Sequence, residues 1–413
     1  MTTTVVIVGG TDPFVRVGGH ETFVLAHAEA AVRAGFDTHV FYVTAADAPT
    51  RTAGWTPHAV RSPVRPLRTM MAWAHAPFLG RAIERFLART SGPVVLHAFG
   101  HWSSVAARVT RRLRRRGRRV VAVASAYTTL THEMRSKLAS VRADHGAGAR
   151  LRALLEYGWV RAVAERAERA GYEAMELVLV NYDAVERLLR EELALTVAIR
   201  RVPYAALTAF TDDPDAAPTR TLPPGAMPPL QPASAPLIVT VSRQDPRKGI
   251  DRLIDALALL KADGVPFRAC LVGGGPLLAT NRALSERMGL RDCTSLPGWV
   301  GDAFAYLRAA DVFVLPSLQE GSGSVSLLEA MQAGCAIVAT RIDGIPEDIT
   351  DGLNGLLVPA DDPRALRDAI ARLLVDGALR ARLGAAARAT FERRFSAEML
   401  VATMRTLYEE LAR

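Results

Sequence analysis

The sequence predicts an α/β fold with two Rossmann-like domains, each built on a doubly wound parallel sheet, that face a central cleft. Short apolar strands alternate with amphipathic helices in both halves of the 413-residue chain, which is typical of parallel βαβ units. A stretch rich in proline, without hydrophobic periodicity, separates the two halves. Ligands bind in such folds at the carboxyl ends of the strands, so we expect the functional site in the cleft.

The N-terminal domain is expected over residues 1–203. It opens with an apolar strand, a glycine-containing loop and an amphipathic helix that ends at Gly35. Apolar strands and helical patterns then alternate to residue 203. Strands are predicted at 4–8, 38–43, 94–97, 119–124 and 177–180, and helices at 21–34, 77–90, 103–116, 150–170 and 184–193.

Residues 204–235 are expected to form an interdomain linker, because proline and aspartate are frequent there and no periodicity is visible. A C-terminal domain is expected at 236–395, followed by a last helix, 396–413, that packs back toward the N-terminal domain. Strands are predicted at 237–241, 268–272, 311–315 and 336–339, and helices at 250–261, 276–288, 325–333, 363–374 and 378–394.

The composition restricts the class of protein. Cys270, Cys293 and Cys335 have no C-x-x-C spacing and lie in apolar surroundings, which indicates reduced core thiols and neither disulfides nor a zinc site. The first ten residues lack the pattern of a signal peptide, and no apolar run reaches about 18 residues. We therefore expect a cytoplasmic protein without a transmembrane helix.

Two stretches each allow two interpretations. Residues 111–119 carry seven arginines, which suit an anionic membrane or nucleic acid, but no aromatic residues are interleaved, so we favour a solvated helix end. Residues 70–87 mix aromatics and methionines, which suits a membrane-touching or acceptor-binding helix, but ordinary core is the favoured interpretation. Neither nucleic acid nor a membrane is thus an expected partner.

A loop in the second half has the chemistry of a pyrophosphate site. Only three of the 51 basic residues are lysines, so each lysine is a stronger signal than an arginine. Arg243 and Lys248 lie between the strand predicted at 237–241 and a helix that begins near Gly249. A helix N-terminus beside two cations favours an anionic ligand, because the helix dipole and both side chains attract the same negative charge.

Two further loops follow predicted strands of the same domain. Gly274 is the middle glycine of a three-glycine run, which lets the backbone approach a ligand closely. Glu320 follows the strand at 311–315, and Glu329 lies in the first turns of the next helix. A carboxylate at Glu329 suits the two hydroxyls of a ribose, and Glu320 is better placed for sugar hydroxyls. The intervening residues with ligand-facing backbone amides are Gly321, Ser322, Gly323 and Ser324.

These motifs together resemble glycosyltransferase family 4, whose members are retaining enzymes of the GT-B fold. The resemblance covers nearly the whole chain and is strongest from residue 237 to 361. Any one of these motifs is moderately specific for the family, and the occurrence of all of them in the family's order is very specific. The motifs are S-R-x4-K at Ser242, Arg243 and Lys248, P-S-x-x-E-G at 316–321, L-L-E-A-M at 327–331, T-x-x-x-G-x-P-E at 340–347 and D-G-x-N-G-x-L-V-x-P at 351–359.

The resemblance implies a role for each residue in binding a nucleoside diphosphate sugar. Arg243 and Lys248 would hold the diphosphate, Glu329 the ribose and Glu320 the donor sugar. It also implies that neither a cofactor nor a metal ion is needed, and that the acceptor attacks on the face from which the diphosphate leaves. The other implied donor contacts are Gly18 and Gly19 near the phosphates and Trp299 and Val300 at the nucleobase.

The chain departs from the family pattern around the sugar. Eight residues separate Glu320 from Glu329, where the family usually has seven, and Tyr127 stands where it often has a histidine. The usual P-N-G is Pro203-Tyr204-Ala205. These departures suggest an unusual donor sugar. Candidates for catalysis are His101, Tyr127 and Glu320, and candidates for acceptor binding are His20, His101 and His132.

Three functions are compatible with this pattern. The leading hypothesis is transfer of a sugar to a small soluble acceptor in antibiotic or secondary metabolism. The alternatives are a membrane-associated lipid or cell-envelope glycosyltransferase, and a non-catalytic GT-B protein that binds sugar nucleotides. The sequence leaves open whether the nucleotide is UDP, GDP, ADP or dTDP, and whether the protein is a monomer or a homodimer.

Overall fold

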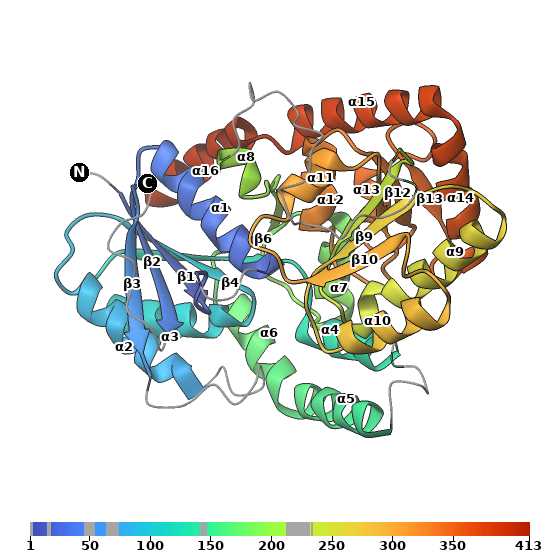
Figure 1. Cartoon of the computed structure of the whole chain (residues 1–413). Helices are drawn as coiled ribbons and strands as arrows, with labels where there is room; N and C mark the ends of the chain where they lie inside the picture. The colour runs from blue at the N-terminus through green and yellow to red at the C-terminus, as the bar shows by residue number, and fades with distance from the viewer. Residues whose placement is uncertain are drawn as a thin grey trace. The chain divides into compact units, whose positions relative to one another are not determined.

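We describe a computed structural model of the chain, shown in Figure 1. The structure describes residues 3–14, 18–44, 54–62, 74–139, 141, 147–211, 232 and 234–413. The chain divides into two compact units. Unit 1 comprises residues 1–135, 153–210 and 395–413, and unit 2 comprises residues 136–152 and 211–394.

Unit 1 is built on a seven-stranded parallel sheet of order β3-β2-β1-β4-β5-β6-β7. All seven residues of β1 and all six of β4 are buried, as expected for central strands covered on both faces. The strand order reverses between β1 and β4, which makes their carboxyl ends the topological switch point. The strands are β1 (Thr4–Gly10), β2 (Asp37–Thr44), β3 (Thr56–Arg61), β4 (Val94–Phe99), β5 (Val120–Ala126), β6 (Leu177–Val180) and β7 (Ile199–Arg201).

Helices cover both faces of this sheet. In Figure 1, α1 and α16 lie on one side and α2 and α3 on the other. His97 of β4 is buried and contacts both the Tyr408 hydroxyl of α16, at 2.6 Å, and the Ser125 hydroxyl, at 2.8 Å, which fixes the last helix to the sheet. The helices are α1 (Gly19–Arg33), α2 (Ala76–Leu87), α3 (Ser103–Arg114), α4 (Leu130–Ala139), α6 (Glu165–Glu173), α7 (Asp183–Glu192), α8 (Thr208–Thr211) and α16 (Ala397–Ala412).

A long helical stretch precedes β6. It consists of α5 (Ala147–Trp159), a π-helical turn (Val160–Ala164) and α6 (Glu165–Glu173). The sequence predicts one helix over 150–170, and the π turn is a local insertion in that pattern. The side chains of Ala153, Val160 and Ala164 are buried, so one face of the stretch packs against the protein.

Unit 2 is built on a six-stranded parallel sheet of order β10-β9-β8-β11-β12-β13. Here the order reverses between β8 and β11, and the loops that follow these two strands meet at one edge of the sheet. The strands are β8 (Leu237–Val241), β9 (Arg268–Val272), β10 (Thr294–Gly298), β11 (Val312–Leu315), β12 (Ala336–Thr340) and β13 (Leu356–Val358).

The core of unit 2 lies between this sheet and its helices. α9 packs with α10 and α14, and α12 packs with α11 and α15. Apolar residues of α9, α14 and the central strands form one continuous cluster. The helices are α9 (Ile250–Ala262), α10 (Leu278–Arg287), α11 (Phe304–Ala309), α12 (Val325–Gln332), α13 (Ile345–Asp348), α14 (Pro363–Val375) and α15 (Gly377–Arg394).

Two doubly wound parallel-sheet units confirm the predicted fold class. Tyr204, at the start of the expected linker, is buried, and its ring packs edge-on against Tyr182 inside unit 1. Residues 212–231 of that linker lie outside the described residues. The structure groups the last helix with unit 1.

The structure describes most of the two stretches that allowed two interpretations, residues 111–119 and 70–87, and all three cysteines. The arginines after Thr110 lie at the exposed end of α3, where Arg112 pairs with Glu84 at 2.9 Å. Within 74–87, α2 buries an apolar face against the sheet and α3, and residues 70–73 lie outside the described residues. All three cysteines are buried, and none of them is joined in a disulfide. Over the described residues, no helix is long and apolar enough to cross a membrane.

Candidate functional site

The switch point of unit 2 brings two loops into direct contact. The loop after β8 forms a short 3-10 turn, Pro246–Lys248, and the Asp245 side chain caps this turn by accepting from the Arg247 amide. The backbone amide of Leu318, in the loop after β11, donates to the Arg247 carbonyl at 2.7 Å. The two loops therefore hold each other in register.

Gly249 makes this close approach possible. Its φ is +59°, and a Cβ atom on it would lie 2.1 Å from the carbonyl oxygen of Pro316. A side chain here would be strained in its backbone conformation and would clash with the neighbouring loop. Glycine at this position thus fixes both the start of α9 and the distance between the two loops.

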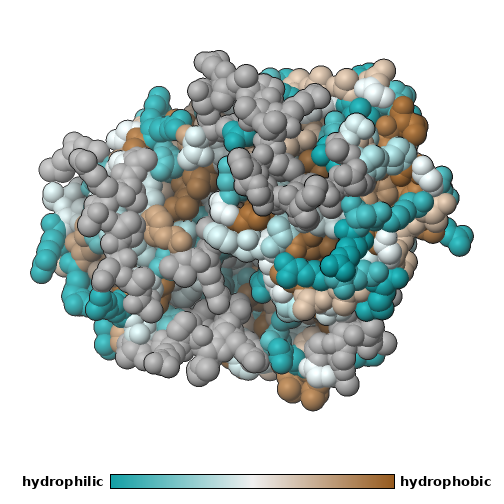
Figure 2. Space-filling view, in the orientation of Figure 1, coloured by the Kyte–Doolittle hydropathy of each residue, from teal (hydrophilic) through white to brown (hydrophobic). Residues whose placement is uncertain are grey.

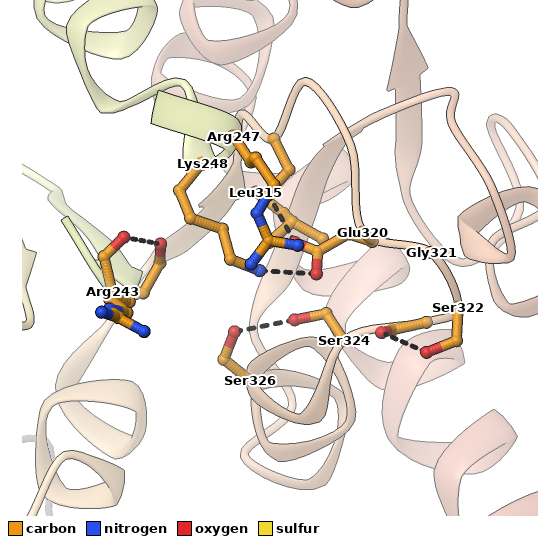
Figure 3. Close-up of polar contacts among 12 residues, drawn as sticks. Arg243, Arg247, Lys248, Leu315, Glu320, Gly321, Ser322, Ser324 and Ser326 are labelled. Carbon is orange, nitrogen blue, oxygen red and sulfur yellow. Dashed lines mark hydrogen bonds and ion pairs between the residues drawn. The ribbon is translucent and has the colours of Figure 1, made fainter. Parts of the chain in front are cut away.

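An ion pair joins the two loops. The Lys248 Nζ atom donates to Glu320 Oε2 at 2.6 Å, and the other carboxylate oxygen accepts from the Ser317 hydroxyl at 2.6 Å. Figure 3 shows the lysine and glutamate side chains pointing toward one another. The Glu320 side chain is only 5% exposed and that of Lys248 17%, so both charges are largely shielded from water.

Asp343 holds the loop that carries Glu320. Its Oδ2 atom accepts from the backbone amides of Glu320, at 2.6 Å, and Gly321, at 2.7 Å. Asp343 has a positive φ of +44°, which is uncommon outside glycine but tolerated by aspartate. Asp343 was not predicted from the sequence, although an aspartate beside Gly344 in the T-x-x-x-G-x-P-E motif was a usable signal.

The residues between the two glutamates form a turn and the start of α12. Ser324 is the N-cap residue, and its hydroxyl lies 3.0 Å from that of Ser326. The Ser322 hydroxyl donates to the Gly323 carbonyl, and the Ser322 carbonyl accepts from the amide of Gly344. The turn is therefore tied both to itself and to the segment that contains Asp343.

Two arginines of the loop after β8 differ in their surroundings. Arg243 is 71% exposed on its side chain and lies 4.0 Å from Asp245, a distant pairing that leaves the guanidinium open to a ligand. Arg247, which was not predicted as a site residue, is 15% exposed on its side chain and lies 3.7 Å from the same carboxylate. Because arginine is so frequent in this chain, nothing in the sequence marked Arg247 out.

The glycine loop after β9 lies against the loop after β8. A Cβ on Gly273 would lie 1.9 Å from the Ser242 carbonyl oxygen, and the Gly274 carbonyl accepts from the amide of Gln244. A Cβ on Gly274 would be 3.5 Å from the Cβ of Trp299. Trp299 is 69% exposed, an unusual state for so large an apolar side chain, and Val300 follows it at a half-buried position.

Glu329 lies on the second turn of α12. Burial, and to a smaller extent the carboxylate of Asp302, raise the pKa of its carboxyl to about 7. Part of the residue still meets solvent. A carboxyl with this pKa changes its charge near neutral pH, which matters for any ligand that needs the ionised form.

Unit 1 contains the remaining candidates from the sequence. Gly18 precedes α1 as its N-cap, Gly19 begins the helix, and His20 Nε2 lies 3.0 Å from the carbonyl oxygen of Gly9. His101 follows β4 in a short 3-10 turn. Burial, and to a smaller extent the nearby His20, lower the pKa of the His101 ring to about 3, so His101 is neutral at physiological pH.

Two other candidates of unit 1 are tied into its packing. The Tyr127 ring stacks on Phe23 with a centroid distance of 4.3 Å, and burial raises the pKa of its hydroxyl. His132 is 6% exposed, and its Nδ1 atom lies 3.2 Å from an Arg135 nitrogen. His132 is therefore packed inside unit 1, at a position with little access to an acceptor.

The contacts of unit 2 thus bring Lys248 and Glu320 together and join the loops after β8, β9 and β11, which carry Arg243, Gly274 and Gly321. Gly18, Gly19, His20, His101, Tyr127 and His132 form the unit 1 candidates. In the described part of the chain, no group of three or more histidine, cysteine, aspartate or glutamate side chains is arranged to hold a metal ion.

Comparison with known proteins points to one family for the second half. Residues 235–376 match the family described as Glycosyl transferases group 1. Similar proteins include WcaL of Escherichia coli K12, named as a colanic acid biosynthesis glycosyltransferase, with 38% identity over 35% of this chain and 37% of the relative. The GDP-mannose-dependent alpha-(1-6)-phosphatidylinositol monomannoside mannosyltransferase of Mycobacterium tuberculosis is 35% identical over 37% of this chain and 42% of the relative. The chain thus spans less than half the length of these relatives in the matched regions.

Solved structures match over nearly the whole chain. Sucrose-phosphate synthase from Thermosynechococcus elongatus has a TM-score of 0.75 at 23% identity, covering 100% of this chain and 99% of that one. Anabaena Alr3699/HepE, in complex with UDP and glucose, has a TM-score of 0.67 at 17% identity, covering 99% and 100%. At these identities the likeness shows the fold. Over residues 235–376 the chain matches the Glycosyl transferases group 1 family, and as a whole it has the two-domain GT-B fold.

Proposed function

We propose that this chain is a retaining glycosyltransferase that transfers a sugar from a nucleoside diphosphate sugar to an acceptor of the cell envelope. The observation that carries the proposal is the ion pair of Lys248 and Glu320 at the switch point of unit 2. A protein that binds such a donor needs a cation for the diphosphate directly beside a hydrogen-bond acceptor for the sugar hydroxyls. The pair supplies both groups on loops that hold each other in place.

The neighbouring residues extend this donor site. Arg243 offers an exposed guanidinium to the diphosphate, and Glu329 offers a carboxylate to the ribose hydroxyls. Trp299 offers an exposed indole face on which a nucleobase can stack. The Glycosyl transferases group 1 match over 235–376 supports these assignments, because it covers all of these residues.

We assign the charge stabilisation of the leaving diphosphate to side chains, without a metal ion. Arg243 and Lys248 carry the positive charge, and the backbone amides at the start of α12 add a favourable dipole. In the reaction, the bond from the anomeric carbon to the diphosphate oxygen breaks. The acceptor oxygen then bonds to that carbon on the same face, and its proton passes to the leaving diphosphate.

His101 and Tyr127 are proposed to position the acceptor and not to remove its proton. The pKa of His101 is lowered to about 3, chiefly by burial, which makes the imidazole a poor base. Burial raises the pKa of Tyr127, which keeps the phenol protonated. Both groups still exchange hydrogen bonds with an acceptor hydroxyl in their neutral forms.

The acceptor class rests on the relatives. WcaL is named for colanic acid biosynthesis, and the mycobacterial relative for a phosphatidylinositol mannoside. These names favour a cell-envelope acceptor over the small soluble acceptor expected from the sequence. The soluble acceptor stays the second candidate, because Tyr127 and Tyr204 replace family residues near the sugar and acceptor.

The test is a transfer assay with labelled donors. The chain is incubated with UDP-glucose, UDP-galactose or GDP-mannose, each radiolabelled in the sugar, together with a membrane extract or a soluble extract. Label in the organic-solvent phase supports the envelope acceptor, and label in a small water-soluble product supports the second candidate. Bound donor without transfer or hydrolysis in either extract would contradict the enzymatic proposal.

A further inference from the structure

The helical stretch from α5 to α6 carries an unusual exposed surface. Leu151, Leu154, Leu155 and Val163 are 59%, 47%, 65% and 48% exposed. They are four of the ten large apolar residues that are exposed in the described chain, gathered within thirteen positions. Figure 2 shows hydrophobic residues in brown low in the view, over the place that α5 occupies in Figure 1. Such a concentration marks a contact surface.

The apolar side chains share one face of the helix. Leu151 and Leu155 are four residues apart, and Leu154 is one turn from Leu151, so the three project together. The opposite face is buried through Ala153 and Val160. The stretch thus lies on the protein along one side and presents leucines along the other.

Every charged side chain that is exposed between residues 148 and 170 is an arginine. Arg161 pairs with Glu165 at 2.6 Å within the helix, and the half-buried Glu156 and Glu165 are the nearest acids on these turns. Leucines flanked by arginines along one helix face match the chemistry of an anionic lipid surface. The exposed arginines are Arg150, Arg152, Arg161, Arg166 and Arg169.

We propose that the α5 face, defined as the exposed leucines and arginines of residues 150–169, docks the protein onto an anionic membrane. The leucines enter the boundary between headgroups and acyl chains, and the arginines contact lipid phosphates. The choice of a membrane as the occupant rests on the proposed function, since a lipid-linked acceptor lies at such a surface. None of the residues assigned to the donor site belongs to this face.

Charge favours a membrane over a second copy of the chain. A two-fold contact through the same face would place these arginines against the identical set on the partner, and like charges repel. An anionic bilayer instead supplies phosphates to all of them at once. Docking of this kind is weakened by salt, because part of its affinity is electrostatic.

Vesicle flotation of the full chain tests the proposal. Two kinds of vesicle are the probes. One is phosphatidylcholine alone, and the other is phosphatidylcholine and phosphatidylglycerol at a molar ratio of about 7:3. We expect binding to the anionic vesicles, weakened in high salt. The triple variant Leu151→Gln/Leu154→Gln/Leu155→Gln should lower the bound fraction at least about tenfold. The matched control, Met288→Gln/Val375→Gln/Met399→Gln, removes three exposed apolar residues elsewhere and should bind as the original chain does.

A second variant keeps the test independent of the leucines. Arg150→Gln/Arg152→Gln/Arg166→Gln should lower binding to anionic vesicles about tenfold or more and weaken its salt dependence. Failure of the original chain to bind, or full binding by the leucine variant, would overturn the proposal. So would a dimer in sedimentation velocity without lipid that the leucine variant converts to a monomer. UDP and GDP affinity should be the same in all variants, so a failed donor site is recognised separately.

Discussion

Lys248 Nζ lies 2.6 Å from Glu320 Oε2, and this single contact connects the loop after β8 with the loop after β11. The two residues are 72 positions apart in the sequence but adjacent at the switch point of unit 2. In the free protein the glutamate neutralises the lysine. A bound diphosphate would compete for that lysine, so donor binding and the position of Glu320 are coupled.

Glu320→Gln should separate binding from transfer. Removing the negative charge frees Lys248 for a diphosphate, so affinity for UDP or GDP should rise by about 1 kcal/mol, or about fivefold. The sugar loses a charged hydrogen-bond acceptor, so transfer should fall about 10- to 100-fold. Titration calorimetry and the transfer assay measure the two effects. Equal losses in both would mean that the residue serves only to hold the loop.

Asp343→Ala should destabilise the loop that carries Glu320. Two backbone amides lose their acceptor, which costs about 1–3 kcal/mol of unfolding free energy. Asp343→Asn keeps one acceptor oxygen and should retain most of the stability. Denaturant unfolding and transfer rates give the comparison. If Asp343→Ala unfolds and transfers as the original chain does, Asp343 does not position Glu320.

Gly249→Ala should impair both stability and nucleotide binding, because the added methyl group lies 2.1 Å from the Pro316 carbonyl oxygen. Gly264 provides a matched control, with a φ of +73° and nothing within 4 Å of an added Cβ. Gly264→Ala should cost only about 1 kcal/mol from backbone strain and leave UDP and GDP binding intact. Similar nucleotide affinities in the two variants would argue against the close loop contact.

The raised pKa of Glu329 predicts a pH-dependent stability. Its pKa of about 7 exceeds the ordinary value of 4.5, so the folded protein holds this proton more tightly than the unfolded chain. The stability that the neutral carboxyl contributes is complete below pH 4.5 and is lost as the pH rises through about 7. Glu329→Gln, which stays neutral, should match the original chain near pH 4.5 and be the more stable protein at pH 8. Thermal unfolding across pH checks this, and parallel curves would contradict it.

The sequence predicted the parts of the fold that depend on continuous apolar runs. The central strands β1, β4, β8 and β11 were all predicted, because each is buried along its whole length or nearly so. The strands β3, β7, β10 and β13 were not predicted. They are short or lie toward the sheet edges, and β10 contains a proline, so tertiary pairing and not local pattern defines them.

The candidate site was predictable where residue type and spacing carry the chemistry. Lys248 stood out because lysine is rare in the chain, and Glu320 because it follows a buried strand. Asp343 was not predicted, since its role depends on a backbone turn and on hydrogen bonds to a loop more than twenty residues away. The leucines of α5 were hidden for a similar reason, because a helical apolar pattern does not tell which face the protein covers.

The most direct test of the donor site is calorimetric titration of UDP and GDP into the original chain and into Lys248→Ala. Lys261→Ala serves as the control, because Lys261 binds Asp292 and the Gly289 carbonyl away from the site. We expect Lys248→Ala to weaken binding of the diphosphate about 10- to 100-fold, with its affinity for the matching nucleoside unchanged, and we expect Lys261→Ala to bind both as the original chain does. Undiminished diphosphate affinity in Lys248→Ala would contradict the assignment of Lys248 to the diphosphate.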